Sequence, residues 1–432
     1  MHSFYYRNGK LFCEGRSVHA LAGEYGTPLY IYSQETLVRR FQMLETALQP
    51  LDHHTCFAVK SNSNLAVLRV LANAGAGFDI VSEGELRRVI AAGGDPSSCL
   101  FAGVGKTEQE IEFALRRNIY CFNAESEPEL IRINRVAARL KKTAPVAVRI
   151  NPNIDAHTHA KITTGTYKYK FGIQFEDVEA IYARAAKLPH LRLRGVQMHI
   201  GSQLTEIKPY ELAVEKVLPL VTRLAARYNL EFFSIGGGLG IVYDPALASG
   251  SAAWWKTAAA KKIMTPASYA ARLIPLLKPL GLKIMIEPGR FIVGNAGILV
   301  AQVQFVKKTG KKNFVIVDAA MNDLVRPAMY DSYHEIVPLT QRKGKSISSD
   351  VVGPICESGD FFCHDRPMPK VGEGDYLAIM SAGAYGFAMA SNYNSRAFAA
   401  EVLVNGKDAE VVRRREKLDE IWAGEKIAAW QR

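Results

Sequence analysis

The stretch TCFAVKSNSNLAVLRVLANAGAGFDIV, residues 55–81, carries the pattern that decides the fold. A short apolar run at 55–60 is followed by a helix-like segment at 64–74 and then by a second apolar run at 77–81. Apolar runs of this length are typical of strands buried on both faces, and parallel strands need a helical crossover between them. The stretch therefore predicts a strand, a helix and a second strand of one parallel sheet.

The same alternation continues on the C-terminal side of this stretch. Seven helix-like segments separate eight apolar runs, and a further helix is expected at 33–49, before the first run. Eight buried strands with intervening helices predict a closed parallel barrel, so the fold class is α/β with a (βα)8 TIM barrel over residues 31–290. The eight predicted strands are 55–60, 77–81, 99–103, 119–123, 146–150, 193–200, 232–238 and 283–287.

The pattern changes after Arg290. Strand-like segments separated by turn residues predict a second, mostly antiparallel β domain over 291–432, which ends in a terminal helix. Residues 1–30 are also strand-like and are expected to join that domain. The basic run Arg413–Arg415 is expected on a solvated face of the terminal helix. Two long connections, 151–174 and 239–265, are expected to be either functional loops or disordered insertions.

Composition excludes several classes of protein. The chain has 432 residues, of which 48% are hydrophobic, and its six cysteines include no CxxC pair, which argues against a zinc site and a disulfide framework. The net charge of +12 is spread along the chain without a nucleic-acid module and suits an enzyme of anionic ligands. Neither a membrane-spanning stretch nor a secretory signal is found. We therefore expect a cytoplasmic location, without nucleic-acid or membrane partners.

Reactive side chains gather where the predicted strands end. Because a TIM barrel carries its active site at the carboxyl ends of its strands, these residues are candidates for one site. A lone lysine such as Lys60 is more often a solvated surface charge. At the end of a buried strand, however, desolvation lowers the pKa of the amine, which can then form a Schiff base. The candidates are Lys60, Asp79, Arg149, His199, Gly236–Gly238, Glu287 and Arg290.

Each remaining candidate has a structural alternative. The run Gly236–Gly238 follows the seventh strand, where barrels commonly hold phosphate, but a tight turn explains it about as well. Glu287 could keep a pyridine nitrogen protonated, or form an ion pair with Arg290 across a turn. His199 could stack on a cofactor ring, with Ser202 binding phosphate; a satisfied core histidine is the commoner case.

Long motifs in a consistent order identify the family. Together they resemble the fold-type III pyridoxal-phosphate-dependent decarboxylases of the alanine racemase-like barrel group and, within it, the diaminopimelate decarboxylases. The resemblance covers nearly the whole chain. The matching motifs are FAVKSN (57–62), FDIVSEGEL (78–86), KFGI (170–173), HIGSQ (199–203), GGGLG (236–240), EPGR (287–290), MNDLVRPAMYDSYHEI (321–336), VVGPICESGDFF (351–362) and SAGAYGFAMASNYN (381–394).

The resemblance implies that pyridoxal 5'-phosphate is the cofactor and that Lys60 carries it as a Schiff base. It implies a homodimer in which Cys356 and Glu357 enter the site from the other subunit, with Cys356 as the acid that acts after decarboxylation. Phe57 and Ser61 replace the usual tyrosine and alanine, with little change of size or polarity. The implied cofactor-binding residues are Lys60, Asp79, Arg149, His199, Ser202, Gly236, Gly237, Gly238, Glu287, Arg290 and Tyr385, with Glu85 nearby.

The implied reaction is conversion of meso-diaminopimelate to L-lysine and CO₂, the last step of lysine biosynthesis. The far end of this substrate carries an amine and a carboxylate. Arg290, Arg326 and Tyr330 offer donors for the carboxylate, and Glu357 offers an acceptor for the ammonium group; Tyr385 is also implied at the substrate. The alternative for Arg326 is a surface ion pair with Asp323.

Two other functions stay open at this stage. One is a related decarboxylase of another basic or D-amino acid, and the other is a non-catalytic pyridoxal-phosphate-binding barrel protein. The second β domain argues against the latter. A racemase is expected to place an arginine at the position of Glu287.

Overall fold

The computed structural model describes residues 2–154 and 170–431, and these form two compact units. Leu37–Ile241 and Lys256–Val293 make up one unit, which we call the barrel unit. Met1–Thr36, Val242–Trp255 and Gly294–Arg432 make up the other, which we call the β unit. Most of the predicted loop 151–174 lies outside the described residues.

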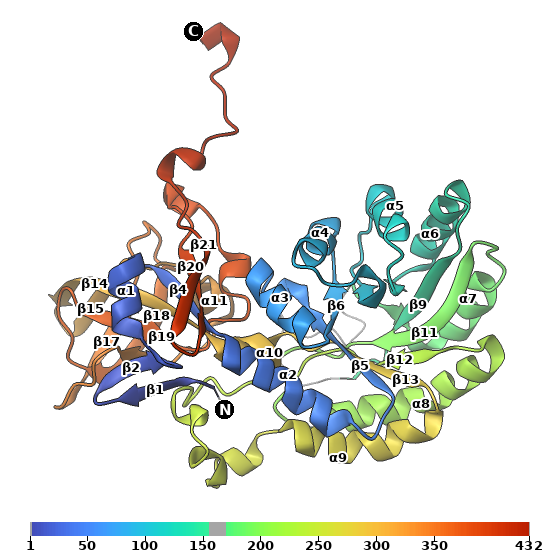
Figure 1. Ribbon diagram of the computed structural model, residues 1–432, viewed down its shortest axis with the longest axis horizontal. Coiled ribbons are helices and arrows are strands. Elements are labelled where there is room, and N and C mark those ends of the chain that lie inside the picture. Colours follow the sequence, from blue (N-terminus) through green and yellow to red (C-terminus); the bar gives the residue numbers. More distant parts are fainter. Residues whose placement is uncertain (1, 155–169, 432) are drawn as a thin grey trace. The chain divides into compact units, whose positions relative to one another are not determined.

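The strands of the barrel unit form one closed parallel sheet (Figure 1). Strands follow one another around the barrel in chain order, and the ring closes where β13 pairs with β5. A two-residue strand, β10 (Ile173–Gln174), adds to the edge of β9. All eight predicted strands are confirmed. They are β5 (His53–Ala58), β6 (Gly77–Ile80), β7 (Cys99–Phe101), β8 (Cys121–Ala124), β9 (Ala144–Asn151), β11 (Leu191–Met198), β12 (Phe232–Ser234) and β13 (Lys283–Ile286).

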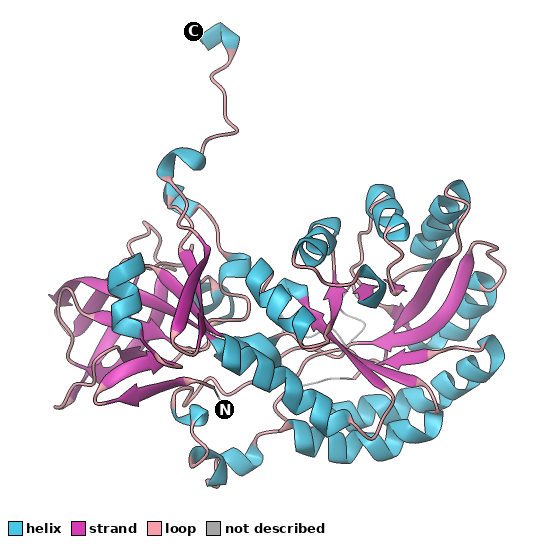
Figure 2. Cartoon of the chain, viewed as in Figure 1, coloured by secondary structure: helices cyan, strands magenta, loops and turns pink. Residues whose placement is uncertain are grey.

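Helices surround these strands (Figure 2). Their starts are encoded locally, because Ser82, Thr107 and Ser126 each accept a hydrogen bond from a backbone N–H in the first turn of the helix that follows. These caps determine the residue at which each helix begins. The helices are α2 (Gln34–Leu48), α3 (Leu65–Asn73), α4 (Glu83–Ala91), α5 (Glu108–Arg116), α6 (Glu127–Arg139), α7 (Val178–Ala185), α8 (Lys208–Tyr228), α9 (Pro266–Leu277) and the short α10 (Arg290–Val293).

One apolar cluster of the barrel strands includes cysteines. Five of the six cysteines are buried, all six are free thiols, and Cys356 alone is exposed. Cys56 and Cys121 pack with Phe232 and Met285 in a fully buried cluster. A buried free cysteine behaves as a small apolar side chain, so these thiols fill the core.

The β unit is built mainly on an antiparallel sheet, as predicted. In the main sheet, as far as its residues are described, only the pairs β15–β17 and β4–β20 are parallel. The order is β18-β17-β15-β14-β4-β20-β21, with β19 pairing to β14 and β16 pairing to β19. The strands are β4 (Leu29–Ser33), β14 (Gly297–Thr309), β15 (Lys312–Val317), β16 (Ile336–Pro338), β17 (Ser346–Val352), β18 (Phe361–Pro369), β19 (Tyr376–Ile379), β20 (Ala400–Asn405) and β21 (Asp408–Arg413).

The N-terminal segment belongs to the β unit. Its strands β1 (Phe4–Arg7), β2 (Lys10–Cys13) and β3 (Arg16–Ser17) form a small antiparallel sheet, followed by α1 (Val18–Tyr25). Apolar side chains of these elements share one buried cluster with side chains of the main sheet: Phe4, Leu11, Val18 and Leu21 pack with Ile298 of β14 and Val402 of β20. Burial of this apolar surface anchors the segment.

The segment Val242–Trp255 also lies in the β unit, whereas the sequence placed it in the barrel. Its backbone is tied there by bonds to distant residues: Leu247 N donates to Glu335, and Ala246 O bonds to the ring of His2. Helical and strand periodicity report only local structure, so they could not assign this loop to a unit.

The predicted terminal helix is wrong. Arg413 ends β21, and the following residues form only short 3₁₀ turns, at Leu418–Glu420 and Ala429–Gln431. The basic run is not one solvated helix face either. Arg413 binds Glu401, Arg414 binds Glu420, and Arg415 donates to the carbonyl of Pro28. Because a strand and a turn expose consecutive side chains in different directions, the three arginines serve different contacts.

Candidate active site

Lys60 lies directly after β5, in a 3₁₀ turn at Val59–Ser61. Its Nζ donates to Oδ2 of Asp79 at 2.8 Å. The Asp79 side chain is buried, whereas 41% of the Lys60 side chain is exposed. The sequence predicted a buried amine here, whereas the Lys60 side chain is substantially exposed, because β5 ends two residues before it. What distinguishes Lys60 is an accessible amine paired with a buried carboxylate.

The turn that carries Lys60 packs against the segment after β13. Ala58 N donates to the carbonyl of Pro288 at 3.1 Å. Ser61, which replaces an alanine of the family pattern, donates its hydroxyl to Ala58 O at 2.7 Å. A Cβ on Gly289 would come within 2.8 Å of this hydroxyl, so only glycine fits there without a shift. Lys60 and the EPGR motif are thus held together by the backbone.

Glu287 follows β13 and is buried. Its carboxylate accepts hydrogen bonds from Ser234 Oγ at 2.6 Å and from Gln197 Nε2 at 3.0 Å. Burial raises the pKa of Glu287 above its usual range, and the nearby negative charge of Asp79 raises it further. The sequence analysis gave an ion pair between Glu287 and Arg290 as an alternative. The structure instead shows Glu287 bonded to Ser234 and Gln197.

Gln197 and Ser234 were not among the predicted site residues. They are register partners on β11 and β12, so both side chains project to the same side of the sheet. Each is a polar residue inside an otherwise apolar strand segment, VQM or FFSI. A buried polar side chain needs a hydrogen-bond partner, and this was the signal that could have identified them.

The glycine turn after β12 brings three strand ends close together. Gly236 has φ 73°, and a Cβ on it would lie 2.4 Å from Met198 O; a Cβ on Gly237 would lie 2.1 Å from Glu287 O. Glycine is therefore required by close packing of the backbone. Gly237 N donates to His199 Nδ1 at 3.3 Å. The turn is a tight packing element, and its capacity to bind phosphate stays a prediction.

His199 directly follows β11 and is partly buried. Burial lowers the pKa of His199 well below its usual value, and the positive charges of Arg149 and Lys60 lower it further. Since Nδ1 accepts the hydrogen bond from Gly237, a neutral ring with its proton on Nε2 fits the site. A neutral, flat ring is compatible with stacking on an aromatic cofactor.

Four further predicted residues lie at the same strand ends. Arg149, on β9, binds Glu125 at 3.0 Å, and Arg290 Nη2 donates to Ser202 Oγ at 3.2 Å. Glu85, in the first turn of α4, accepts from Val81 N at 2.7 Å. Burial raises the pKa of Glu85 to about 7, although the charge of Lys60 acts in the opposite direction. The predicted barrel residues thus converge on one end of the barrel.

Within the β unit, Arg326 begins the short helix α11 (Arg326–Tyr330) and is buried. Its guanidinium donates to Tyr243 Oη at 2.6 Å and to Ser332 Oγ at 3.1 Å, and lies 3.3 Å from His334 Nε2. His334 Nδ1 bonds to Met380 O, which leaves Nε2 to accept from Arg326. Arg326 is therefore not the surface residue of the alternative interpretation. Tyr330, partly buried, ends the same helix.

Cys356 and Glu357 lie in an exposed loop between β17 and β18. Cys356 N donates to Asn394 Oδ1 at 3.1 Å, and Tyr393 Oη donates to Glu357 at 3.2 Å. The buried carboxylate of Asp360 accepts from Ile355 N and from the backbone of the MND segment, both at 2.7 Å. Asp360, which the sequence analysis did not single out, therefore shapes the loop.

Tyr385 lies in the SAGAY segment of the β unit. Its φ is 57°, in the left-handed region, and Ser381 has φ 58°. Residues other than glycine adopt this conformation at a cost of about 1–2 kcal/mol, and such positions cluster at functional sites. Asn295 Nδ2 donates to Ser381 Oγ at 2.7 Å and helps to hold the segment in place.

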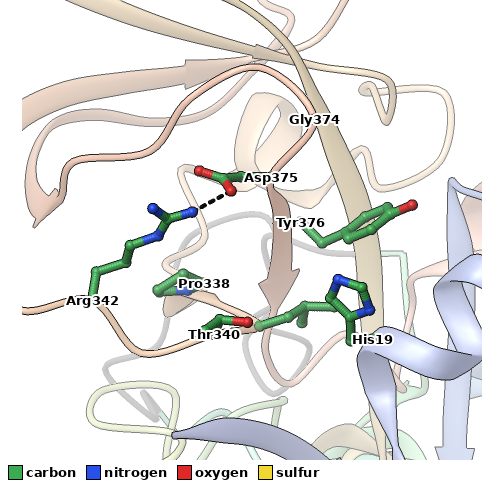
Figure 3. Close-up of a pocket in the computed structure, with 8 residues that line it drawn as sticks. His19, Pro338, Thr340, Arg342, Gly374, Asp375 and Tyr376 are labelled. Atoms are coloured by element: carbon green, nitrogen blue, oxygen red, sulfur yellow. Dashed lines mark hydrogen bonds and ion pairs between the residues drawn. The ribbon is translucent and has the colours of Figure 1, made fainter.

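A pocket in the β unit involves none of the predicted residues (Figure 3). It has a volume of about 50 Å³ and is lined by His19, Pro338, Arg342, Asp375 and neighbours. Arg342 and Asp375 form an ion pair across it. Because ligand sites for small molecules usually enclose about 300 Å³ or more, this pocket is too small for an amino acid.

Comparison with known proteins identifies the family. Residues 34–294 match the family model of the pyridoxal-dependent decarboxylases, pyridoxal-binding domain. Over 99% of both chains, the protein is 47% identical to the diaminopimelate decarboxylase of Pseudomonas aeruginosa. The chain belongs to the diaminopimelate decarboxylase family. The resemblance found in the sequence is thereby confirmed.

Solved structures of the diaminopimelate decarboxylase family share this fold. The enzyme of Helicobacter pylori, solved with L-lysine, is 39% identical to this chain and superposes on it with a TM-score of 0.87. The match covers 94% of this chain and 98% of the Helicobacter pylori chain. A lysine/ornithine decarboxylase of Vibrio vulnificus shares only the fold, at 23% identity and a TM-score of 0.76. Membership of the diaminopimelate decarboxylase family makes the chain a pyridoxal-phosphate-dependent enzyme.

The barrel site fits the family's cofactor. Asp79 Oδ1 is buried and has no hydrogen-bond partner among the described residues. A hydrogen-bond donor of a bound cofactor could therefore satisfy this oxygen. Glu287 is a buried carboxyl group whose ionised form is penalised, which a cationic ring nitrogen would relieve. Within the described residues, no cluster of side chains suits a metal ion, and no helix has the length and apolar character needed to cross a membrane.

Proposed function

We propose that the chain decarboxylates meso-diaminopimelate to L-lysine and CO₂ with pyridoxal 5'-phosphate. One observation carries the proposal. The accessible amine of Lys60, paired with buried Asp79, lies at the strand ends that also carry the buried Glu287, in a chain 47% identical to a diaminopimelate decarboxylase. Pyridoxal phosphate supplies, when bound, the electron sink for the electron pair that remains when CO₂ leaves.

The barrel residues hold and tune the cofactor in this proposal. Lys60 carries the cofactor through its amine, and Asp79 holds that amine in place. The Glu287 carboxylate pairs with the ring nitrogen and favours its cationic form, while Ser234 and Gln197 fix the orientation of the carboxylate. We assign the remaining cofactor contacts to Arg149, His199, Ser202, Gly236, Gly237, Gly238, Arg290 and Tyr385.

We assign the far end of the substrate to five residues in this proposal. Arg290, Arg326 and Tyr330 are donors for the distal carboxylate, Glu357 is an acceptor for the distal ammonium group, and Tyr385 is a further substrate contact. The support for Arg326 is its buried guanidinium, held by Tyr243, Ser332 and His334. A side chain fixed in this way loses little entropy when a carboxylate binds.

Cys356 delivers the proton that completes the reaction in this proposal. Its thiol is exposed in the described chain, as expected of a group that acts on a neighbouring subunit. We propose a homodimer in which Cys356 and Glu357 complete the partner's site. Six free cysteines suit a reducing compartment, which supports a cytoplasmic location.

A CO₂-release assay with added pyridoxal phosphate tests the substrate. We expect release from meso-diaminopimelate and little from ornithine, lysine or arginine, because these lack a distal carboxylate for Arg326. Arg326→Gln keeps hydrogen-bonding capacity but removes the charge, and we expect its KM for diaminopimelate to rise about tenfold or more. Faster turnover of ornithine than of diaminopimelate by the unmodified chain would overturn the substrate assignment.

Mixing two inactive variants tests the shared site. Lys60→Ala and Cys356→Ala chains, refolded or co-expressed together, should recover part of the activity, because a mixed dimer contains one site with both residues intact. Absence of any recovery, with mixed dimers demonstrated by two affinity tags, would contradict the sharing of sites.

A further inference from the structure

A buried chain of four charged side chains connects the loops at the active end of the barrel unit. Lys106 Nζ donates to Glu129 at 2.6 Å, and Glu129 accepts the backbone N–H of Glu125 at 2.8 Å. Glu125 in turn binds Arg149 at 3.0 Å. None of the four side chains is more than 8% exposed. Charged groups are almost never this deeply buried unless they are paired, so the arrangement is specific.

Glu125 is the centre of this chain. Besides Arg149 on β9, its carboxylate accepts Gly103 N at 2.9 Å, from the loop after β7, and Gly172 N at 3.1 Å, from the segment that leads into β10. One carboxylate thus ties together a strand end and two loops. The guanidinium of Arg149 also lies over the ring of Phe171, at 4.9 Å from its centroid.

Arg149 belongs to the layer of side chains that faces the site. It is the register partner of Gln197, which is the register partner of Ser234. Register partners on parallel strands project to the same side, and Gln197 and Ser234 both donate to Glu287. The charge of Arg149 also reaches His199, whose pKa it lowers. Arg149 is therefore part of the electrostatic environment of the site.

We propose that Glu125 is a positioning residue that fixes the Arg149 guanidinium at the cofactor site, and that Lys106 and Glu129 hold Glu125 in place. The inference rests on the proposed function, because it takes Arg149 as a cofactor contact. Without the carboxylate, a buried guanidinium would lose its counter-charge and would move toward water. A binding group must be held within about 0.5 Å of its productive position, and a second layer of residues usually does this.

Cofactor affinity of the apoprotein tests this role. Glu125→Gln keeps the size of the side chain and removes its charge, and we expect the Kd for pyridoxal phosphate to rise about tenfold, as for other residues that support a binding group. The matched control is Glu127→Gln, two residues away, which removes an exposed ion pair with Arg184 and should leave the Kd unchanged. Fluorescence titration gives the Kd, and circular dichroism verifies the fold of each variant.

A double-mutant cycle separates positioning from general support of the fold. If Glu125 acts through Arg149, then Glu125→Gln in an Arg149→Gln background should change the Kd no further. An equal loss of affinity in both backgrounds would contradict the role, as would an unchanged Kd in the single variant. If Glu125→Gln does not fold, Glu129→Gln serves instead, with a smaller expected loss that the same background should abolish.

The two proposals fail in different ways. An unmodified chain that does not bind pyridoxal phosphate would contradict the proposed function itself. Equally tight binding by the unmodified chain and by Glu125→Gln would contradict only the positioning role.

Discussion

Lys60 and Lys106 occupy similar places in the chain and differ in what surrounds them. Each follows a barrel strand, β5 or β7, and each donates to a carboxylate, Asp79 at 2.8 Å or Glu129 at 2.6 Å. The Lys60 side chain is 41% exposed, whereas that of Lys106 is 1% exposed. Lys106 also donates to the carbonyls of Gly103 and Asn123, which accounts for all three of its N–H groups.

The difference shows why we propose Lys60, and not Lys106, as the reactive lysine. Both lysines have a carboxylate partner, so pairing alone does not mark a reactive amine. Lys60 can be reached from solvent, and a carbonyl compound can therefore approach its nitrogen. Lys106 could react only after breaking three hydrogen bonds in a closed interior. Accessibility at the open end of the barrel is what distinguishes Lys60.

Removing Lys60 should have the largest effect. We expect Lys60→Ala to fold and to lose CO₂ release by roughly 10⁴-fold or more, as when other covalent catalysts are removed. Borohydride reduction of the unmodified holoenzyme, followed by peptide mapping, should label Lys60 and leave Lys106 unlabelled. A label on any other lysine would show that Lys60 does not carry the cofactor.

Removing Lys106 should act on stability. Lys106→Met leaves Glu129 buried without its counter-charge, so we expect the free energy of unfolding to fall by about 3 kcal/mol. Urea unfolding measures the loss, and borohydride should still label Lys60 in the variant. If Lys106→Met were as stable as the unmodified protein but borohydride no longer labelled it, Lys106 would be the reactive lysine and our assignment would be wrong.

The carboxyl group of Glu85, which lies near Lys60, should make the free energy of unfolding depend on pH. Burial raises its pKa from 4.5 to about 7, so the folded state binds this proton more tightly than the unfolded state. The stability that it contributes is complete below pH 4.5 and is lost as the pH rises to about 7. In urea unfolding of the apoprotein, the unmodified chain should lose stability relative to Glu85→Gln across this range. Parallel curves for the two proteins would contradict the raised pKa.

An exposed ion pair of the same barrel should have the smallest effect. Arg184 and Glu127 pair on the surface with side chains 53% and 34% exposed. Because water screens such pairs, Arg184→Ala should leave the unfolding temperature within measurement error. If Arg184→Ala lowered stability as much as Lys106→Met, burial would not determine how much an ion pair contributes to stability.

Local pattern was enough to predict the barrel and to select part of its candidate site. Each of the eight strands was an apolar run bounded by turn residues, and each helix that followed had its own capping residue, such as Thr107. Lys60, Asp79 and Glu287 were predicted because parallel strands in a barrel end at the same face. The terminal helix was wrong, because the charged segment after β20 pairs as a strand with β20.

The sequence by itself determined the order of strands and helices in the barrel and which polar and charged residues stand at the strand ends, because those features depend on neighbours a few positions apart. Only the tertiary structure decided that Glu125 holds Arg149, 24 positions away, and that Gln197 and Ser234 hold Glu287, 90 and 53 positions away. It also decided which of two lysines is accessible. Such contacts form when the sheet closes, and no local pattern encodes them.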